Sequence, residues 1–259
     1  MPSRVRSVRV EAIVLRHNDW GEADRLLGLF TREMGKLRAI AKGVRKPRSR
    51  KAGHLEPFTR VNLLLAKGRD MWIVTQAETV NAHLCLREDL ERVGYASYAI
   101  ELLDRFTYEE GENPALYRLL AETLARLDTG PDPRLPIHYY EMRLLDLLGF
   151  RPQLFNCTTC GEEIHAVDQY FSPSLGSVLC PRCGAATAGA APISMAALKY
   201  LRHFQRSSYN EAARARPAGE VEREIERLLQ QYLTYLLERA LNTPSFLRKV
   251  RQQPKYQGE

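Results

Sequence analysis

The chain has 259 residues, of which 44% are hydrophobic, so it can bury a core and exceeds the usual size of one domain. No apolar run approaches a membrane span, and the N-terminus lacks the apolar stretch of a signal peptide, so we expect a soluble, cytoplasmic protein. The net charge is +7, and residues 1–60 hold fifteen Lys or Arg against six Asp or Glu. This segregation indicates a polyanionic partner, either nucleic acid or an anionic membrane, although a merely solvated basic face is a third interpretation.

Residues 4–79 alternate between apolar and polar side chains, which predicts short β-strands. Glycine-containing turns precede the third and the fifth strand. Five short antiparallel strands fit an OB-fold, a barrel whose exposed face binds oligonucleotides, and an SH3-like barrel would give a similar pattern. The expected strands are Val8–Leu15, Arg25–Thr31, Lys36–Lys42, Arg60–Ala66 and Met71–Thr79.

From Asp89 onward the apolar period changes to 3.6, which predicts amphipathic helices. Ser194 is a suitable N-cap for one of them. Almost every residue from Gly184 to Pro192 is small, so we expect a flexible joint there. The expected helices cover residues 90–106, 114–127, 137–149, 195–206 and 221–240.

The predicted fold class is α+β and multidomain, with a five-stranded OB-fold barrel followed by an α-helical domain that carries an inserted four-cysteine zinc finger. The expected parts are the barrel (1–80), a discontinuous helical domain (81–153 and 190–252), the zinc finger (154–189) and a flexible tail (253–259).

Four of the five cysteines form two Cys-x-x-Cys pairs separated by nineteen residues, a spacing typical of structural zinc sites. Cys157, Cys160, Cys180 and Cys183 are therefore predicted to bind one structural Zn²⁺, and four thiolates leave no position for an activated water. Disulfides in an oxidised preparation, or His165 in place of a cysteine, are alternatives that a complete set of thiols does not require. Cys85 is expected to be a small buried hydrophobe.

The segment between Glu33 and Glu56 contains eight cations and no acid, so it is the candidate site for nucleic-acid phosphates. Alternation places the cations of the third strand opposite its apolar side chains, and the loop that follows is expected to be mobile. A solvated basic loop without a partner is the competing interpretation. The predicted DNA-binding residues are Lys36, Arg38, Lys42, Arg45, Lys46, Arg48, Arg50 and Lys51.

The chain contains, in order, Gly21-Glu22-Ala23-Asp24-Arg25, Thr31, Gly35-Lys36-Leu37, Ala41-Lys42-Gly43-Val44-Arg45 and Leu55-Glu56-Pro57-Phe58. This set resembles the N-terminal signature of the RecO family. The resemblance extends through Leu144–Pro152, both cysteine pairs and the C-terminal helices ending near Leu247-Arg248-Lys249, so it covers nearly the whole chain. Many relatives have paired glycines where this chain has Leu175-Gly176, which puts one turn of the zinc loop in doubt.

The resemblance implies a DNA-binding recombination mediator of DNA repair. Such a protein binds single- and double-stranded DNA, anneals complementary strands and acts with RecR to load the RecA recombinase. It also implies contact with the C-terminal tail of the single-stranded-DNA-binding protein, for which Arg126, Arg134, Arg143 and Arg151 are candidate residues. Some relatives lack the cysteines, so the resemblance makes zinc a stabiliser, and the protein is expected to be nucleoid-associated and to bind no membrane.

No ATP-binding, metalloprotease or ligase motif is present, so we expect no enzymatic activity. An RNA- or ribosome-associated factor remains the alternative, because a barrel with a zinc ribbon also suits that role.

Overall fold

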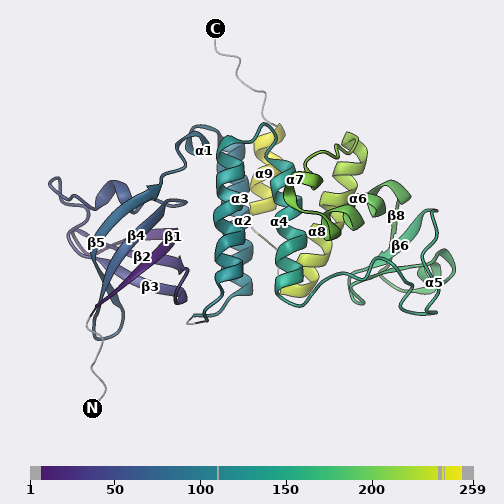
Figure 1. Cartoon of the computed structure of the whole chain (residues 1–259), viewed down its shortest axis with the longest axis horizontal. Coiled ribbons are helices and arrows are strands. Elements are labelled where there is room, and N and C mark those ends of the chain that lie inside the picture. The colour runs from purple at the N-terminus through teal and green to yellow at the C-terminus, as the bar shows by residue number, and fades with distance from the viewer. Residues whose placement is uncertain (1–6, 110, 239–240, 242, 253–259) are drawn as a thin grey trace, which may run out of the picture. The chain divides into compact units, whose positions relative to one another are not determined.

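The computed structural model describes residues 7–109, 111–238, 241 and 243–252, so the predicted tail (253–259) lies outside the described residues (Figure 1). The chain divides into two compact units. The first combines Met1–Pro133 with Thr243–Glu259, and the second is Arg134–Asn242. No helix within the described ranges is both long and apolar enough to cross a membrane.

The first unit contains the predicted barrel, and all five expected strands are confirmed. Its strands are hydrogen-bonded in the closed order β1-β2-β3-β5-β4, the topology of an OB-fold. One expectation is wrong: β3 and β5 pair in parallel, through Ala39 with Trp72 and Ile40 with Ile73, while the other pairs are antiparallel. The strands are β1 (Ser7–Trp20), β2 (Asp24–Thr31), β3 (Gly35–Ala41), β4 (Arg60–Lys67) and β5 (Trp72–Asn81).

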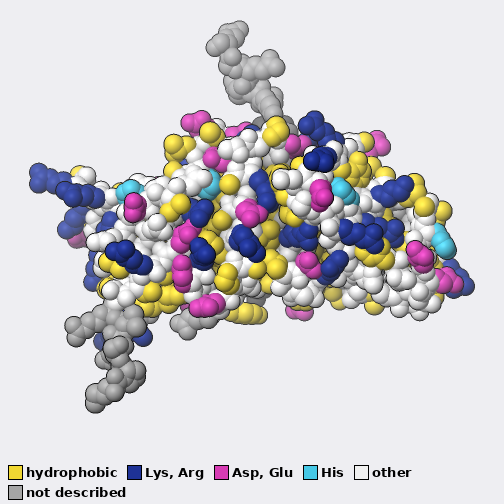
Figure 2. All heavy atoms as spheres, in the orientation of Figure 1, with side chains coloured by type: hydrophobic (Ala, Val, Ile, Leu, Met, Phe, Trp, Pro, Cys, Tyr) yellow, Lys and Arg dark blue, Asp and Glu magenta, His cyan; other side chains and the backbone are white. Residues whose placement is uncertain are grey.

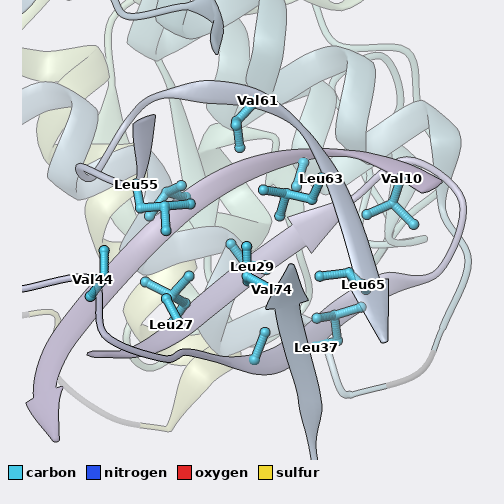
Figure 3. Close-up of a cluster of buried hydrophobic side chains, with 14 residues drawn as sticks. Val10, Leu27, Leu29, Leu37, Val44, Leu55, Val61, Leu63, Leu65 and Val74 are labelled. Atoms are coloured by element: carbon cyan, nitrogen blue, oxygen red, sulfur yellow. The ribbon is translucent and has the colours of Figure 1, made fainter. Parts of the chain in front are cut away.

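Strand β1 closes the barrel because it is long enough to pair with both β2 and β4. Its register against β2 shifts between Val14 and Arg16, and such a bulge bends a strand toward a second partner. The inward side chains of all five strands, with Val44 and Leu55 from the β3–β4 connection, fill the interior (Figure 3). The barrel therefore has a packed core and presents its outer surface for binding.

Four helices complete the first unit: α1 (Leu84–Glu88), α2 (Leu90–Phe106), α3 (Pro114–Thr129) and α9 (Thr243–Gln252). Helix α3 covers part of the outer barrel wall, where Tyr117 stacks on Phe30 with ring centroids 6.4 Å apart. Helix α9 packs on α2 at Gly94, where an added Cβ would lie 2.5 Å from Leu247. The glycine allows this close approach, which returns the C-terminal helix to the first unit.

The second unit contains helices and a small three-stranded sheet, ordered β7-β6-β8. Its expected helices are confirmed where the structure describes them, and residues 239–240 of the last one lie outside the described residues. Ser194 caps α6 by accepting a hydrogen bond from the Ala197 N–H. The Leu175-Gly176 turn joins β6 to β7, with Gly176 at a φ of 58°. The elements are α4 (Arg134–Leu147), β6 (Gln169–Ser172), β7 (Ser177–Leu179), α5 (Pro181–Ala186), β8 (Ala191–Ile193), α6 (Met195–Arg206), α7 (Tyr209–Ala212) and α8 (Gly219–Leu237).

The predicted flexible joint at Gly184–Pro192 is wrong at both ends. Gly184 belongs to α5, where an added Cβ would lie 2.3 Å from the Tyr170 Cβ. Pro192 belongs to β8 and is aligned with Tyr170 of β6. Small side chains occur here because α5 and β8 pack closely on β6, and composition alone does not distinguish close packing from flexibility.

Candidate nucleic-acid interface and metal centre

Residues 42–51, called the basic loop below, leave β3 and lead to the short 3₁₀ turn η1 (Ala52–His54). The loop is anchored at its start, because the Gly43 N–H donates to Asp24 Oδ1 at 2.7 Å and the Arg45 N–H donates to the Ala23 carbonyl at 2.9 Å. Gly43 has a φ of 64°, a conformation that glycine adopts without strain. We expected this loop to be mobile, but its first residues are held against the start of β2.

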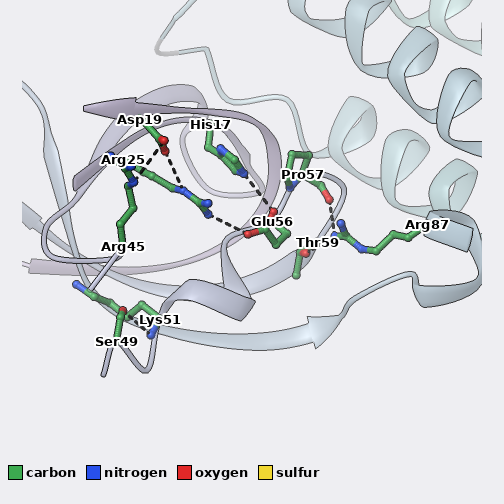
Figure 4. A network of polar contacts seen from close by, with 10 residues as sticks. All are labelled: His17, Asp19, Arg25, Arg45, Ser49, Lys51, Glu56, Pro57, Thr59 and Arg87. Atoms are coloured by element: carbon green, nitrogen blue, oxygen red, sulfur yellow. Dashed lines mark hydrogen bonds and ion pairs between the residues drawn. The ribbon is translucent and has the colours of Figure 1, made fainter. Parts of the chain in front are cut away.

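A network of ion pairs supports the start of the basic loop (Figure 4). Asp19 lies between two arginines, 3.4 Å from Arg25 Nε and 3.3 Å from Arg45 Nε. Glu56 accepts from Arg25 at 2.9 Å and contacts His17 at 3.1 Å. Although partial burial raises the pKa of Glu56, its bonds to Arg25 and His17 lower it overall. Asp19, which precedes the cationic segment in sequence, thus positions Arg45, a role that sequence reasoning missed.

Six of the eight predicted DNA-binding residues are exposed. Two of them pair with acids, Arg38 with Glu109 and Arg45 with Asp19. The other four make no ion pair with any carboxylate in the described part of the chain, so their charges face solvent. These four are Lys42, Lys46, Arg48 and Arg50.

Three of the eight predicted residues make closer contacts with the rest of the chain. Lys36 is mostly buried against α2, with its Nζ 2.6 Å from Asp104 Oδ1 and 2.7 Å from the Asp104 carbonyl. Arg38 is exposed but lies 2.7 Å from Glu109. Lys51 donates to the carbonyls of Lys42 and Val74, and burial lowers its pKa although Asp24 opposes the shift.

The two tryptophans differ in exposure. Trp72 is half-buried and packs against the barrel core, which confirms the expected core role. Trp20 ends β1 beside Gly21 and is 56% exposed, so its ring is accessible for stacking. Stacking of a nucleic-acid base on Trp20 stays a prediction.

The four predicted metal ligands come together in the second unit. Their sulfur atoms all lie within 4.8 Å of one another, and Cys160 Sγ is 3.8 Å from Cys180 Sγ. Four thiolates about 2.3 Å from a tetrahedral ion would lie about 3.8 Å apart, so the set fits a metal of that coordination. His165 is exposed, and the predicted burial of Cys85 is wrong because that side chain is exposed as well.

Each cysteine pair is shaped by backbone hydrogen bonds within the pair. The Gly161 N–H donates to the Cys157 carbonyl and the Gly184 N–H donates to the Cys180 carbonyl, both at 2.8 Å. Burial raises the pKa of Cys157, but backbone hydrogen bonds from Cys180, Cys160 and Thr159 lower it to about 6. The pKa of Cys183 is raised to about 12, chiefly by its neighbour Cys180. Four adjacent thiolates repel one another, so a bound cation is needed to hold all of them ionised.

The barrel places the first unit among the OB-fold proteins, a class in which an exposed barrel face binds oligonucleotides. Comparison with known families is consistent with that class. The chain belongs to the recombination protein O (RecO) family: the model of the family's N-terminal part matches residues 5–83, and that of its C-terminal part matches residues 87–244.

Curated relatives named DNA repair protein RecO cover most of the chain. The Roseiflexus sp. (strain RS-1) protein is 43% identical over 249 residues, which is 96% of this chain and 88% of the relative. The Pelotomaculum thermopropionicum protein is 39% identical over 250 residues, 96% of this chain and 97% of the relative. The Dehalococcoides mccartyi (strain CBDB1) protein is 36% identical over 231 residues, 89% of this chain and 91% of the relative.

Proposed function

We propose that the chain is a non-enzymatic, nucleoid-associated recombination mediator. In this role it binds single- and double-stranded DNA, anneals complementary strands and helps RecR to load RecA. Membership of a family of DNA repair proteins supports the biological role. The observation that carries DNA binding is the set of exposed, unpaired cations on the basic loop, because phosphates are neutralised by such side chains.

We assign the phosphate contacts chiefly to Lys42, Lys46, Arg48 and Arg50, with Arg45 held beside them by Asp19. Lys36 and Lys51 support the site by fixing β3 and the loop, since their ammonium groups donate to backbone carbonyls. Arg38 contributes when its exposed pair with Glu109 opens. Contacts to the backbone alone give affinity with little dependence on base sequence.

The metal in this proposal is one structural Zn²⁺ held by Cys157, Cys160, Cys180 and Cys183. Zinc suits a closed set of four thiolates. It would cross-link the two cysteine pairs and would not take part in a reaction. We further propose that the chain has three functional parts: the barrel, the helices and the cysteine module.

The remaining partner is the acidic C-terminal tail of the single-stranded-DNA-binding protein. Its candidate arginines already contact acids: Arg126 pairs with Glu122, Arg134 with Glu222, and Arg143 and Arg151 with Asp146. A tail carboxylate would have to compete with these acids, so the tail is expected to bind weakly. A titration that gives no stronger binding than a scrambled peptide would remove this partner.

The test of the proposed function is annealing of two complementary strands coated with the single-stranded-DNA-binding protein. The triple variant Lys46→Ala, Arg48→Ala, Arg50→Ala should anneal several-fold more slowly than the wild type. A control variant, Arg223→Ala with Arg227→Ala, removes two exposed cations from α8 and should anneal normally. Wild-type protein that anneals no strands, or that prefers RNA to single-stranded DNA in direct competition, would refute the proposal and favour an RNA-associated role.

A further inference from the structure

A second cationic segment lies in the second unit, far from the basic loop in sequence. Residues 199–216 contain five Lys or Arg and one acid, Glu211. The apolar face of α6 is buried through Leu198, Leu201 and Phe204. Its opposite face presents Lys199, Arg202 and Arg206, which helical spacing places in one row. Figure 2 shows Lys and Arg side chains on the visible face of the second unit as well as on the barrel.

Two of these arginines are held by an aromatic ring rather than by acids. The guanidinium carbon of Arg206 lies 3.8 Å from the ring centroid of Phe155, and that of Arg202 lies 5.0 Å from it. Arg202 Nε also donates to the Leu154 carbonyl at 2.8 Å. Neither arginine makes an ion pair within the described ranges of the chain, so stacking orders both groups and leaves other N–H donors available.

The surrounding charges favour an added anion at this position. Burial lowers the pKa of Arg202, the charge of Arg206 lowers it further, and Glu163 opposes the shift. The Glu211 carboxylate is occupied at the start of α7, where it accepts from the Ser208 N–H at 2.8 Å and from its hydroxyl at 2.9 Å. Two guanidinium groups around one ring repel each other, and a phosphodiester bound near them would reduce this repulsion.

We infer that Lys199, Arg202 and Arg206, ordered by Phe155, form a second binding surface for the phosphate backbone of a nucleic-acid strand, separate from the basic loop. This surface, called the α6 surface, rests on the proposed function and adds a place for the second strand. Annealing needs two polyanions near each other, and one chain with two cationic surfaces can hold both at once. Phe155 acts as a positioning residue, because it orders the arginines without contacting the strand.

The experiment measures how many non-pairing oligo-dT strands bind per chain, because such strands report occupancy without annealing. Wild-type protein at low salt should saturate at two strands per chain. Arg206→Glu should saturate at one strand, since Arg206 is exposed and makes no hydrogen bond with the described residues. The matched control Arg227→Glu, an equal charge reversal on α8, should retain two strands.

Should Arg206→Glu lose its circular dichroism spectrum, the double variant Lys199→Gln with Arg206→Gln replaces it with the same expectation. Saturation of the wild type at one strand, or of the folded variant at two, would overturn the α6 surface while leaving the proposed function intact. Failure of the wild type to bind any strand would instead refute the proposed function. If the Arg206→Glu variant lost the binding of an acidic peptide but bound as many strands as the wild type, the α6 surface would belong to a protein partner. That result would overturn the inference.

Discussion

Gly184 tests whether packing of α5 on β6 sets the position of the metal ligands. An alanine Cβ at this position would lie 2.3 Å from the Tyr170 Cβ and 2.4 Å from its Cγ, and this Cβ moves only with the β6 backbone. Because overpacking of this kind costs about 1–3 kcal/mol, α5 must shift and displace Cys180 and Cys183. If the metal-bound state bears this strain, Gly184→Ala should weaken metal binding about 5- to 150-fold.

The assay is competition with a chromophoric chelator at neutral pH, using zinc as the metal. Gly219→Ala is the matched control, since it makes the same change in the same unit and an added Cβ there meets nothing nearer than 3.6 Å. The control should keep wild-type affinity. Equal affinity in Gly184→Ala and the wild type would refute the reasoning that α5 packing positions the sulfurs.

The remaining predictions concern the metal and the dependence of stability on pH. Elemental analysis of reduced protein should find about one zinc per chain. The Cys157→Ser variant should lose this zinc, and its hydrogen exchange should increase first around residues 154–189. Wild-type protein that contains no metal would contradict this prediction. Glu56 has a lowered pKa in the folded state, so it stabilises the protein above about pH 4.5 and this contribution is lost as the pH falls. Glu56→Gln should therefore show a smaller decrease of melting temperature on acidification than the wild type. Burial lowers the pKa of His83, so folding should weaken as the pH falls below about 6.5, and a His83→Gln variant with an unchanged pH profile would contradict that role.

The strands and most helices of this chain follow directly from local patterns. Alternation identified the inward residues of β3, and Leu37, Ala39 and Ala41 are indeed buried. The parallel pairing of β3 with β5 could not be predicted in the same way, because a period of two says which face is buried and not which strand lies beside it. The three-stranded sheet was missed since its strands have only three or four residues each.

The metal site was predictable because the cysteine spacing itself carries the information. The cationic site was less predictable from the sequence. The sequence pattern places Lys36 on the barrel surface. In the structure its side chain is mostly buried against α2, where Asp104 accepts from it through its carboxylate and its carbonyl. The α6 surface was overlooked because its cations lie in a part of the chain that is acidic on balance, and only the structure places Phe155 beside Arg202 and Arg206.

The salt dependence of single-stranded DNA binding tests the central claim most directly, namely that the basic loop neutralises phosphates. Each phosphate neutralised on a single strand contributes about −0.7 to the slope of log K against log salt. Replacing Lys46, Arg48 and Arg50 by Ala should therefore make the slope less steep by about 2, with an unchanged circular dichroism spectrum because these are exposed loop residues. A triple variant that binds single-stranded DNA with the wild-type slope would contradict the account and place the DNA-binding surface elsewhere.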